Sequence, residues 1–280
     1  MKPVAIVTDS TSDLPTSVAE PLGIHIIPCN VHFGTEVYRE RIDLTNDEFY
    51  QRLANSPQLP KTSQPASGVF EELYRQLASA HSGIVSIHIA AKLSGTLQSA
   101  DIAAKEIREV PVATIDSGST SMGLGWLAVM AARAAQAGQS FADVVGVVND
   151  ATPRVRILAL LENLENVTKG GRIGKGAALL GTMLSVKPIL SVRNGEVIPL
   201  EKPRTWQKAQ TRLVDLAKGL SPFDELAVLH ARAAADAQQL CERLSQIHPR
   251  ERILVTELGA VLGTHAGRGT IGIAAITGKG

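Results

Sequence analysis

The chain has 280 residues, of which 44% are hydrophobic and 20% are charged, and its formal net charge at pH 7 is +1. These values are typical of a folded globular protein and exclude an intrinsically disordered chain, and the length predicts two domains or one large α/β domain. The longest apolar run covers residues 122–132, too short for the roughly 20 residues that a transmembrane helix needs.

Strand-like and helix-like segments alternate along the first half of the chain. Short runs rich in β-branched residues predict strands at residues 4–9, 23–33, 83–90 and 112–116. Helical patterns cover residues 68–80 and 96–110 and an alanine-rich stretch ending near Gly138, while Thr45 and Glu48 have the spacing of a capping box that starts another helix. Residues 55–67 read as a linker. This alternation is typical of βαβ units on a parallel sheet.

Three of the predicted strands end in loops rich in hydroxyl groups, at residues 8–12, 94–96 and 116–121. In open α/β sheets, ligands bind beyond the carboxyl ends of the strands, and helix N-termini at that edge favour anions. Ser, Thr and Asp also cap helices, which accounts for part of this pattern. Three such loops on one edge nevertheless predict a ligand site there.

The pattern changes after Pro153. Asn194-Gly195 joins two strand-like runs within residues 185–202 and is a strong hairpin signal. Helices are expected at residues 206–218 and 236–245, and strands at residues 225–231, 252–258 and 270–277. We therefore expect a parallel-sheet α/β domain at residues 1–153, a mixed-sheet α/β domain at residues 154–280, and a ligand between them.

Charge is unevenly distributed along the chain. Residues 1–150 carry 10 Lys/Arg against 16 Asp/Glu, residues 151–220 carry 12 against 5, and residues 221–280 carry 6 of each, which gives −6, +7 and 0. The basic middle segment favours an anionic ligand or partner. Nucleic acid is disfavoured, because only Trp206 accompanies this charge and single-strand binders use clustered aromatic residues.

The basic segment contains the glycine-rich sequence KGGRIGKG at residues 169–176. Its spacing differs from a Walker loop, because only three residues separate Gly170 from Gly174 and Gly176 stands where a hydroxyl residue should follow the lysine. The loop amides could still bind an anion. A solvated basic turn is the alternative.

Catalytic and metal sites are weakly indicated. A serine hydrolase could use Ser94, Ser119 or Ser121 with His265 as base, but no GxSxG nucleophile elbow is present. The seven histidines show no metal-ligand pairing, and Cys29 and Cys241 form no CxxC motif. We expect no metal, no cofactor, reduced cysteines and, without a signal peptide at the N-terminus, a cytoplasmic protein. His265 is expected in a glycine-flanked turn between two strands.

Several segments taken together resemble the DegV family of bacterial fatty-acid-binding proteins. They occur in the family's order and cover nearly the whole chain: VTDSTSDLP, KTSQPAS, AAKLSGTLQSA, IDSGSTSMGLG, KGGRIGKG, KPIL followed by NGEV, KPRT and LGTHAGRGTIGI. The resemblance implies a two-domain lipid carrier without catalytic turnover of its own, holding one long-chain fatty acid in a tunnel. It also implies a partner, an ATP-dependent fatty acid kinase that phosphorylates the bound carboxylate for phospholipid synthesis. Transient contact with a membrane surface is compatible with this role.

The resemblance also implies roles for individual residues. Thr62, Ser63, Ser94 and His265 match the positions that contact the carboxylate, and Arg172 and Arg204 match cationic positions that serve phosphoryl transfer or docking of the kinase. The sequence departs from the family pattern at Ala66, at Ala90-Ala91 and at Glu40-Arg41, where Ser, a pair of serines and Asp-Gly are common. An autonomous hydrolase or acyltransferase using Ser94 and His265, or a carrier of another hydrophobic anion, remains as an alternative.

Overall fold

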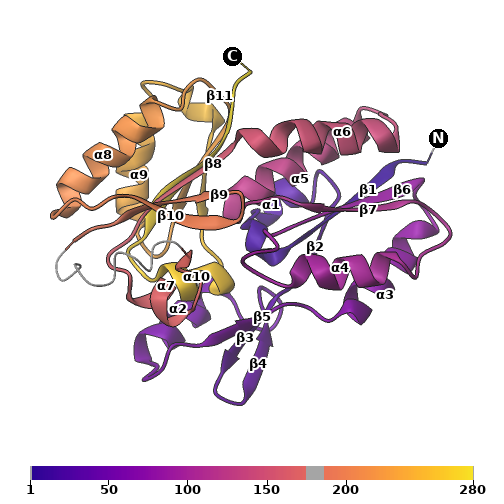
Figure 1. Cartoon of the computed structure of the whole chain (residues 1–280), viewed down its shortest axis with the longest axis horizontal. Coiled ribbons are helices and arrows are strands. Elements are labelled where there is room, and N and C mark those ends of the chain that lie inside the picture. Colours follow the sequence, from indigo (N-terminus) through magenta and orange to yellow (C-terminus); the bar gives the residue numbers. More distant parts are fainter. Residues whose placement is uncertain (1, 175–185, 280) are drawn as a thin grey trace.

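The computed structural model describes residues 2–174 and 186–279 and shows a mixed α/β protein built on three sheets (Figure 1). The first sheet is parallel, with strand order β2-β1-β6-β7. Its strands are β1 (Val4–Asp9), β2 (Ile24–Ile27), β6 (Gly83–His88) and β7 (Val112–Asp116). All six residues of β1 and of β6 are buried, as expected for central strands of a parallel sheet covered on both faces.

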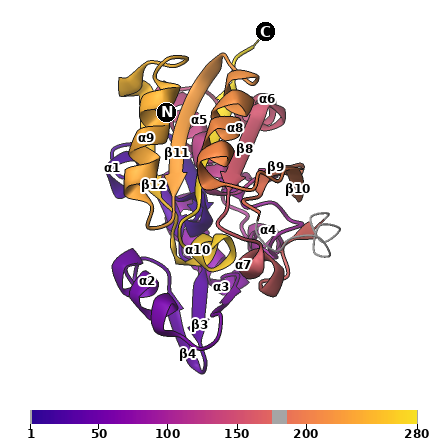
Figure 2. The same cartoon turned by 90° about the vertical axis from the view of Figure 1, so that its left-hand side faces the viewer.

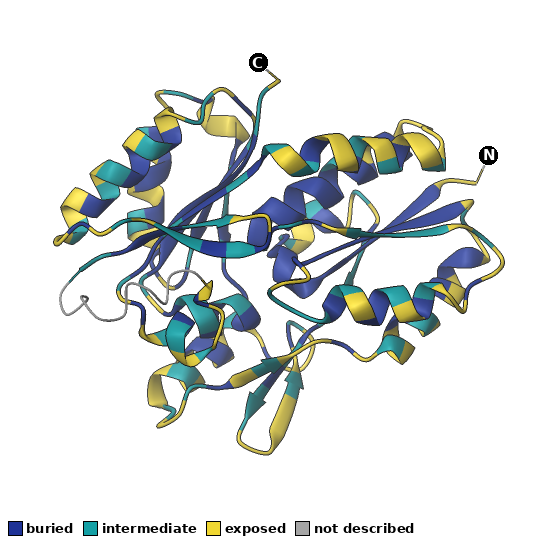
Figure 3. Cartoon of the chain, viewed as in Figure 1, coloured by how far each residue is buried: buried dark blue, intermediate teal, exposed yellow. Residues whose placement is uncertain are grey.

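Helices cover both faces of the first sheet, as Figures 1 and 3 show. One face carries α3 (Ser67–Ala78) and α4 (Thr96–Ala104), and the other carries α5 (Ser121–Gln136) and α6 (Phe141–Ala151). The α5 helix is buried along almost its whole length, because it lies between this sheet and the second one. Two short turns, η1 (Ser10–Ser12) and α1 (Thr16–Ala19), follow β1.

The second sheet has six strands in the order β10-β9-β8-β13-β11-β12. Only the β11–β12 pair is parallel, so the sheet is mixed, as predicted. Its strands are β8 (Val155–Leu160), β9 (Ile189–Arg193), β10 (Glu196–Glu201), β11 (Phe223–His230), β12 (Ile253–Glu257) and β13 (Ile271–Thr277). The helices α8 (Trp206–Lys218) and α9 (Ala234–Leu244) cover its outer face, as the view in Figure 2 also shows. The other elements described in this half are η2 (Thr152–Arg154), α7 (Glu165–Lys169), η4 (Arg250–Arg252) and α10 (Ala260–Ala266).

A third sheet, with strand order β4-β3-β5, differs from the sequence-based prediction. The single strand region expected at residues 23–33 divides at Pro28 into β2 of the first sheet and β3 (Asn30–Phe33) of the third. The segment expected as a linker contains β5 (Lys61–Ser63), which pairs with β3, and β4 (Glu36–Arg39) forms the other edge. The α2 helix (Asn46–Asn55) lies between β4 and β5 in the chain.

Other local predictions are confirmed. Thr45 and Glu48 form the capping box at the start of α2, and Asn194-Gly195 closes the β9–β10 hairpin. Within the described ranges, no helix is long and apolar enough to cross a bilayer. The largest hydrophobic core joins residues of the first half, such as Leu127, to residues of the second, such as Ile276. Residue 153 separates the strands of the two larger sheets, and the division into domains at this point stays a proposal.

Candidate functional site

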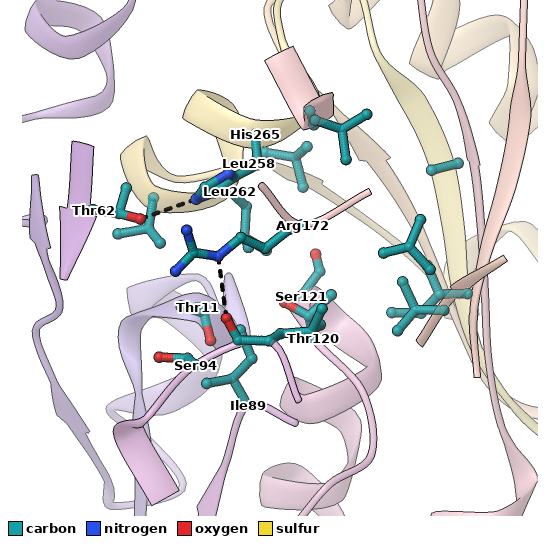
Figure 4. Close-up of a pocket in the computed structure, with 18 of the residues that line it drawn as sticks. Thr11, Thr62, Ile89, Ser94, Thr120, Ser121, Arg172, Leu258, Leu262 and His265 are labelled. Carbon is teal, nitrogen blue, oxygen red and sulfur yellow. Dashed lines mark hydrogen bonds between the residues drawn. The ribbon is translucent and has the colours of Figure 1, made fainter. Parts of the chain in front are cut away.

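The three hydroxyl-rich loops follow neighbouring strands of the first sheet, β1, β6 and β7, at their carboxyl ends. Thr11, Ser94, Thr120 and Ser121 from these loops all line one cavity between the first and second sheets. Figure 4 shows Thr11, Ser94 and Ser121 on one side of this cavity, with Thr62, Arg172 and His265 facing them. The predicted juxtaposition of these loops at one edge of the sheet is therefore confirmed.

Most of the cavity wall is apolar. Alternation along β8 directs Ile157 and Ala159 into the cavity, while Leu158 and Leu160 pack in the core beneath α8 and α9. Other apolar wall residues come from α7, β9, β10 and the α10 region: Val167, Leu190, Val192, Val197, Leu258, Val261 and Leu262. The cavity has a volume of about 160 Å³. Measured in the same way, a cavity that holds one water molecule has a volume of roughly 10–15 Å³. The cavity thus has room for a chain of on the order of ten methylene-sized groups.

One end of the cavity is polar. Thr62 Oγ1 and His265 Nε2 are hydrogen-bonded at 2.9 Å, which joins β5 to α10 across the site (Figure 4). Arg172 lies beside them, where its Nε donates to the Leu93 carbonyl at 3.3 Å and its Nη1 donates to the Gly170 carbonyl at 2.8 Å. These contacts hold a cation and two neutral polar groups together where the apolar wall ends.

Ser63 and Ser94 also line the cavity, but their hydroxyl groups have other partners. Successive residues of a strand point to opposite faces, and Ser63 Oγ lies 2.8 Å from His32 Nε2 whereas Thr62 faces His265. Ser94 Oγ is hydrogen-bonded to Thr96 Oγ1 at 2.8 Å at the start of α4. Thr62 is therefore more directly placed for a ligand head group than Ser63.

Arg204 does not join the other predicted site residues. It is exposed in the loop between β10 and α8 and is absent from the cavity wall. Lys175 and Gly176, the last two residues of KGGRIGKG, lie outside the described residues. In the described part of that motif, Gly170 and Gly171 turn the chain after α7 so that Arg172 reaches the cavity.

His265 lies on α10 and not in the turn that the flanking glycines had indicated, so that prediction was wrong. Its ring packs against Gly170, where a Cβ would come within 2.2 Å of Nδ1. Nδ1 is buried and has no hydrogen-bond partner among the described residues. Burial, together with the charge of Arg172, lowers the pKa of His265 to about 4. The ring is therefore neutral at pH 7, and Arg172 supplies the positive charge at this end of the cavity.

The α10 helix is fastened to the first half of the chain by two buried carboxylates. The Val261 N–H donates to Glu40 Oε1, and the Gly259 N–H donates to Asp13 Oδ1, both at 2.8 Å. On the other side, Ser10 Oγ donates to Glu40, and Ser121 Oγ donates to Asp13 at 2.6 Å. Glu40 and Asp13 are thus positioning residues for His265, and the sequence analysis did not identify this role for either.

Burial dominates the titration of both carboxyl groups. It raises the pKa of Glu40 to about 7 and that of Asp13 to about 6, even though Arg41 and the hydrogen bonds act in the opposite direction. The sequence contained one signal for this pair of carboxyl groups. It was Glu40-Arg41, which stands where Asp-Gly is common in the DegV pattern. Arg41 has a φ of +66° and lies with Nη2 3.9 Å from Asp13 Oδ1.

The hydrolase alternative finds little support in this geometry. His265 Nε2 is paired with Thr62, Ser94 with Thr96, and Ser121 with Asp13, so no serine is hydrogen-bonded to His265 among the described residues. In the described part of the chain the Ser119 hydroxyl is buried without a partner, and no carboxylate there orients Nδ1 of His265. A base with a pKa near 4 is also poorly matched to neutral pH. In the same ranges no cluster of His, Cys, Asp and Glu is arranged to hold a metal ion.

Comparison with known proteins decides the family. The family model described as "Uncharacterised protein, DegV family" matches residues 3–278. The chain belongs to the DegV family. A DegV domain-containing protein of Streptomyces coelicolor is 38% identical over 275 residues, which cover 96% of this chain and 97% of the relative.

Solved DegV structures share the fold. A DegV family protein from Thermus thermophilus, described for its fatty acid binding, superposes with a TM-score of 0.91 at 32% identity and covers 98% of this chain and 99% of its own. DegV of Bacillus subtilis, described as a fatty acid binding protein, superposes with a TM-score of 0.88 at 34% identity, covering 99% and 100%. The four-stranded parallel sheet and the six-stranded mixed sheet are thus the DegV architecture.

The three departures from the DegV sequence pattern lie at separate places in the structure. Ala66 precedes α3 as an N-cap residue without a side-chain hydrogen bond. Ala90 is buried against the β9–β10 hairpin, where a Cβ on Gly195 would lie 3.1 Å from the Ala90 Cβ. Glu40 accepts the hydrogen bond that fastens α10, and neither Glu40 nor Arg41 lines the cavity.

The raised pKa of Glu40 predicts a pH-dependent effect of Glu40→Gln on the stability of this DegV protein. A carboxyl whose folded pKa is raised, here from 4.5 to about 7, stabilises the fold fully below pH 4.5 and loses that contribution as the pH rises through 7. Glutamine keeps the acceptor for Val261 and does not ionise. We expect the free energy of unfolding of Glu40→Gln, relative to wild type, to increase by on the order of 3 kcal/mol between pH 4.5 and pH 8.

Urea unfolding at a series of pH values measures this difference. The exposed Glu72→Gln serves as the matched control and should show no such trend. An effect of Glu40→Gln that is the same at both ends of the pH range would contradict the prediction.

Proposed function

We propose that this protein binds a long-chain fatty acid in the cavity between the two larger sheets and presents its carboxylate to a separate ATP-dependent fatty acid kinase, which forms the acyl-phosphate for phospholipid synthesis. The observation that carries the proposal is an apolar cavity that ends at Thr62, His265 and Arg172. Membership of the DegV family, whose similar structures from Thermus thermophilus and Bacillus subtilis are described as fatty acid binding, supports the choice of ligand.

The two parts of the cavity suit the two parts of a fatty acid. Burial of the tail stabilises the complex by about 0.8 kcal/mol per methylene group, so the apolar wall supplies most of the affinity. The polar end orients the carboxylate, with hydroxyl donors at Thr62 and Ser94. Because these donors are neutral, they leave the carboxylate oxygens more nucleophilic toward a phosphoryl group than a bidentate arginine would.

The protonation of His265 should depend on whether a fatty acid is bound. A carboxylate next to the ring favours its protonated form and opposes the burial that lowers its pKa to about 4. Fatty acid binding is therefore expected to raise the pKa of His265. Arg172 and, from its exposed loop, Arg204 are proposed to meet the phosphates or the acidic surface of the kinase.

The first experiment is mild organic extraction of the purified protein followed by mass spectrometry of the extract. We expect one long-chain fatty acid per protein molecule, and an increase in melting temperature when palmitate is added to delipidated protein. A different hydrophobic anion in the extract would show that the protein carries that anion and not a fatty acid. Esterase activity of the isolated protein, lost in Ser94→Ala, would favour the hydrolase instead.

Two variants separate binding from presentation to the kinase. Arg172→Ala is expected to lower acyl-phosphate formation about tenfold more than it lowers palmitate affinity, because the guanidinium acts on phosphoryl or partner charge in addition to the ligand. Ser94→Ala is expected to weaken or misorient palmitate binding. The measurements are palmitate titration without kinase and acyl-phosphate formation with kinase and ATP. Equal losses of both in Arg172→Ala would reject its role toward the kinase.

A further inference from the structure

A second cleft lies between the two larger sheets, away from Thr62 and His265. Its volume is about 510 Å³, within the range of about 300–1,000 Å³ typical of small-molecule sites. Figure 1 shows the region, where the end of α6 meets the start of β8 beside β9. The loop after β7 forms its other wall, with Asp116 and Ser119, and Val192 lines both this cleft and the apolar cavity.

Two arginines with the same charge face this cleft. Arg156 on β8 and Arg193 on β9 occupy the position next to the Ile157–Val192 pair, so they lie opposite each other on adjacent antiparallel strands. Like charges placed this way destabilise a sheet. Burial, together with the charge of Arg193, lowers the pKa of Arg156, as expected for a guanidinium that lacks a compensating anion. Within residues 2–174 and 186–279, neither arginine makes an ion pair.

Two backbone carbonyls hold the Arg156 side chain in the wall of the cleft. Arg156 Nη1 donates to the carbonyl oxygens of Pro153 and Val155, both at 2.8 Å, which fixes the guanidinium and leaves its Nε and Nη2 without an acceptor in the described part of the chain. The carboxylate in the cleft, that of Asp116, accepts the Gly118 N–H at 2.8 Å and the Ala91 N–H at 3.3 Å. Its charge is directed to the backbone, not to the arginines.

Neutral polar groups complete the wall. The Ser119 hydroxyl is buried without a hydrogen-bond partner among the described residues, but it lies against Gly123, where an added Cβ would come within 2.3 Å of it, so it is not open to the cleft. Asn149 and Asn194 add amide groups around the arginines, whereas the Thr152 hydroxyl donates to the Val148 carbonyl at 2.8 Å. Two neighbouring guanidinium groups with amide donors beside them are a donor set that suits phosphate.

We propose that this cleft is a second binding site that takes a small phosphate-bearing molecule, with the phosphate between Arg156 and Arg193. The ligand would contact the loop after β7 from the first half of the chain and β8 and β9 from the second, so it would tie the two halves together. Since Val192 is common to both cavities, occupancy of the cleft and of the apolar cavity should be thermodynamically coupled.

The test is a titration of delipidated protein with inorganic phosphate, and separately with glycerol 2-phosphate, against sodium chloride of equal ionic strength. Melting temperature and isothermal titration calorimetry are the measurements. We expect a saturable signal with phosphate and a stronger one with glycerol 2-phosphate if the natural ligand is a phosphate ester. Arg193→Gln should weaken binding about tenfold. Because this arginine is exposed and its side chain forms no hydrogen bond or ion pair with the described residues, the variant should fold normally.

Arg156→Lys tests geometry, since it keeps the charge and loses the planar donor set. Arg108→Gln, at an exposed arginine that does not line the cleft, is the matched control and should bind as wild type. No saturation with either phosphate probe, or identical titrations for wild type and Arg193→Gln, would overturn the proposal. These readouts do not involve a fatty acid, so they stand or fall separately from the proposed carrier function.

Discussion

Ala159→Trp is expected to weaken palmitate binding by roughly 60- to 200-fold. Ala159 is a small residue on the cavity-facing side of β8, among larger apolar wall residues. An indole at this position would exclude three or four methylene groups of the ligand, at about 0.8 kcal/mol each, which gives about 2.4–3.2 kcal/mol. Titration of delipidated protein with palmitate measures the loss.

Chain length provides the internal control for this variant. Octanoate has a shorter tail, so its affinity should fall much less than that of palmitate if the indole blocks only the deep part of the cavity. Ala159→Val should give an intermediate effect. Ala142→Trp, on the exposed face of α6, adds the same side chain elsewhere and should leave binding unchanged. Equal losses for octanoate and palmitate would show that the tail does not run past Ala159.

Gly259→Ala is expected to reduce the free energy of unfolding by about 3 kcal/mol and to weaken fatty acid binding as well. A Cβ at this position would lie 2.3 Å from Glu40 Oε1 and 3.2 Å from Asp13 Oδ1. Both carboxylates are buried and held by other donors, so they have little freedom to withdraw. The start of α10 would have to move, and His265 would move with it.

Gly146→Ala is the matched control for Gly259→Ala. Gly146 lies in α6, is exposed, and has no heavy atom within 4 Å of a Cβ added there. Alanine should therefore stabilise the protein by about 0.5–1 kcal/mol, through helix propensity. Urea unfolding measures both variants. In Gly259→Ala, the additional change Glu40→Asp should recover part of the loss, because the shorter side chain makes room. Independent, additive effects of these two changes would contradict a direct contact.

The parts of the fold that local sequence determines were predictable. The Thr45–Glu48 capping box, the Asn194-Gly195 hairpin and helix α8 each depend on residues close together in the chain. The gathering of the hydroxyl-rich loops at one edge of the first sheet was also predictable, because parallel strands put their carboxyl ends on the same side and these loops follow those strands. The site residues near this edge, Thr62 and Arg172, were found by resemblance to the DegV family.

Elements that depend on tertiary contacts were missed. The seven-residue α10 has Gly259, Gly263 and Gly267 in and around it, so its pattern indicated a turn, whereas the helix is fastened by Glu40 from a distant part of the chain. Strand β5 is three residues long and has no hydrophobic alternation, and it forms only because β3 offers it a pairing edge. The pairing of Ser63 with His32 depends on that strand and could not be predicted without it.

Both halves of the chain contribute to the wall of the apolar cavity, and this affects how fast a ligand can enter and leave. Its residues come from the loops at the edge of the first sheet, from strands of the second sheet and from α10, so a bound tail would be packed between the two halves of the chain. A movement of those halves or of α10 would loosen the wall around such a ligand and shorten the lifetime of the complex. A partner that loosens α10 would therefore speed both loading and release.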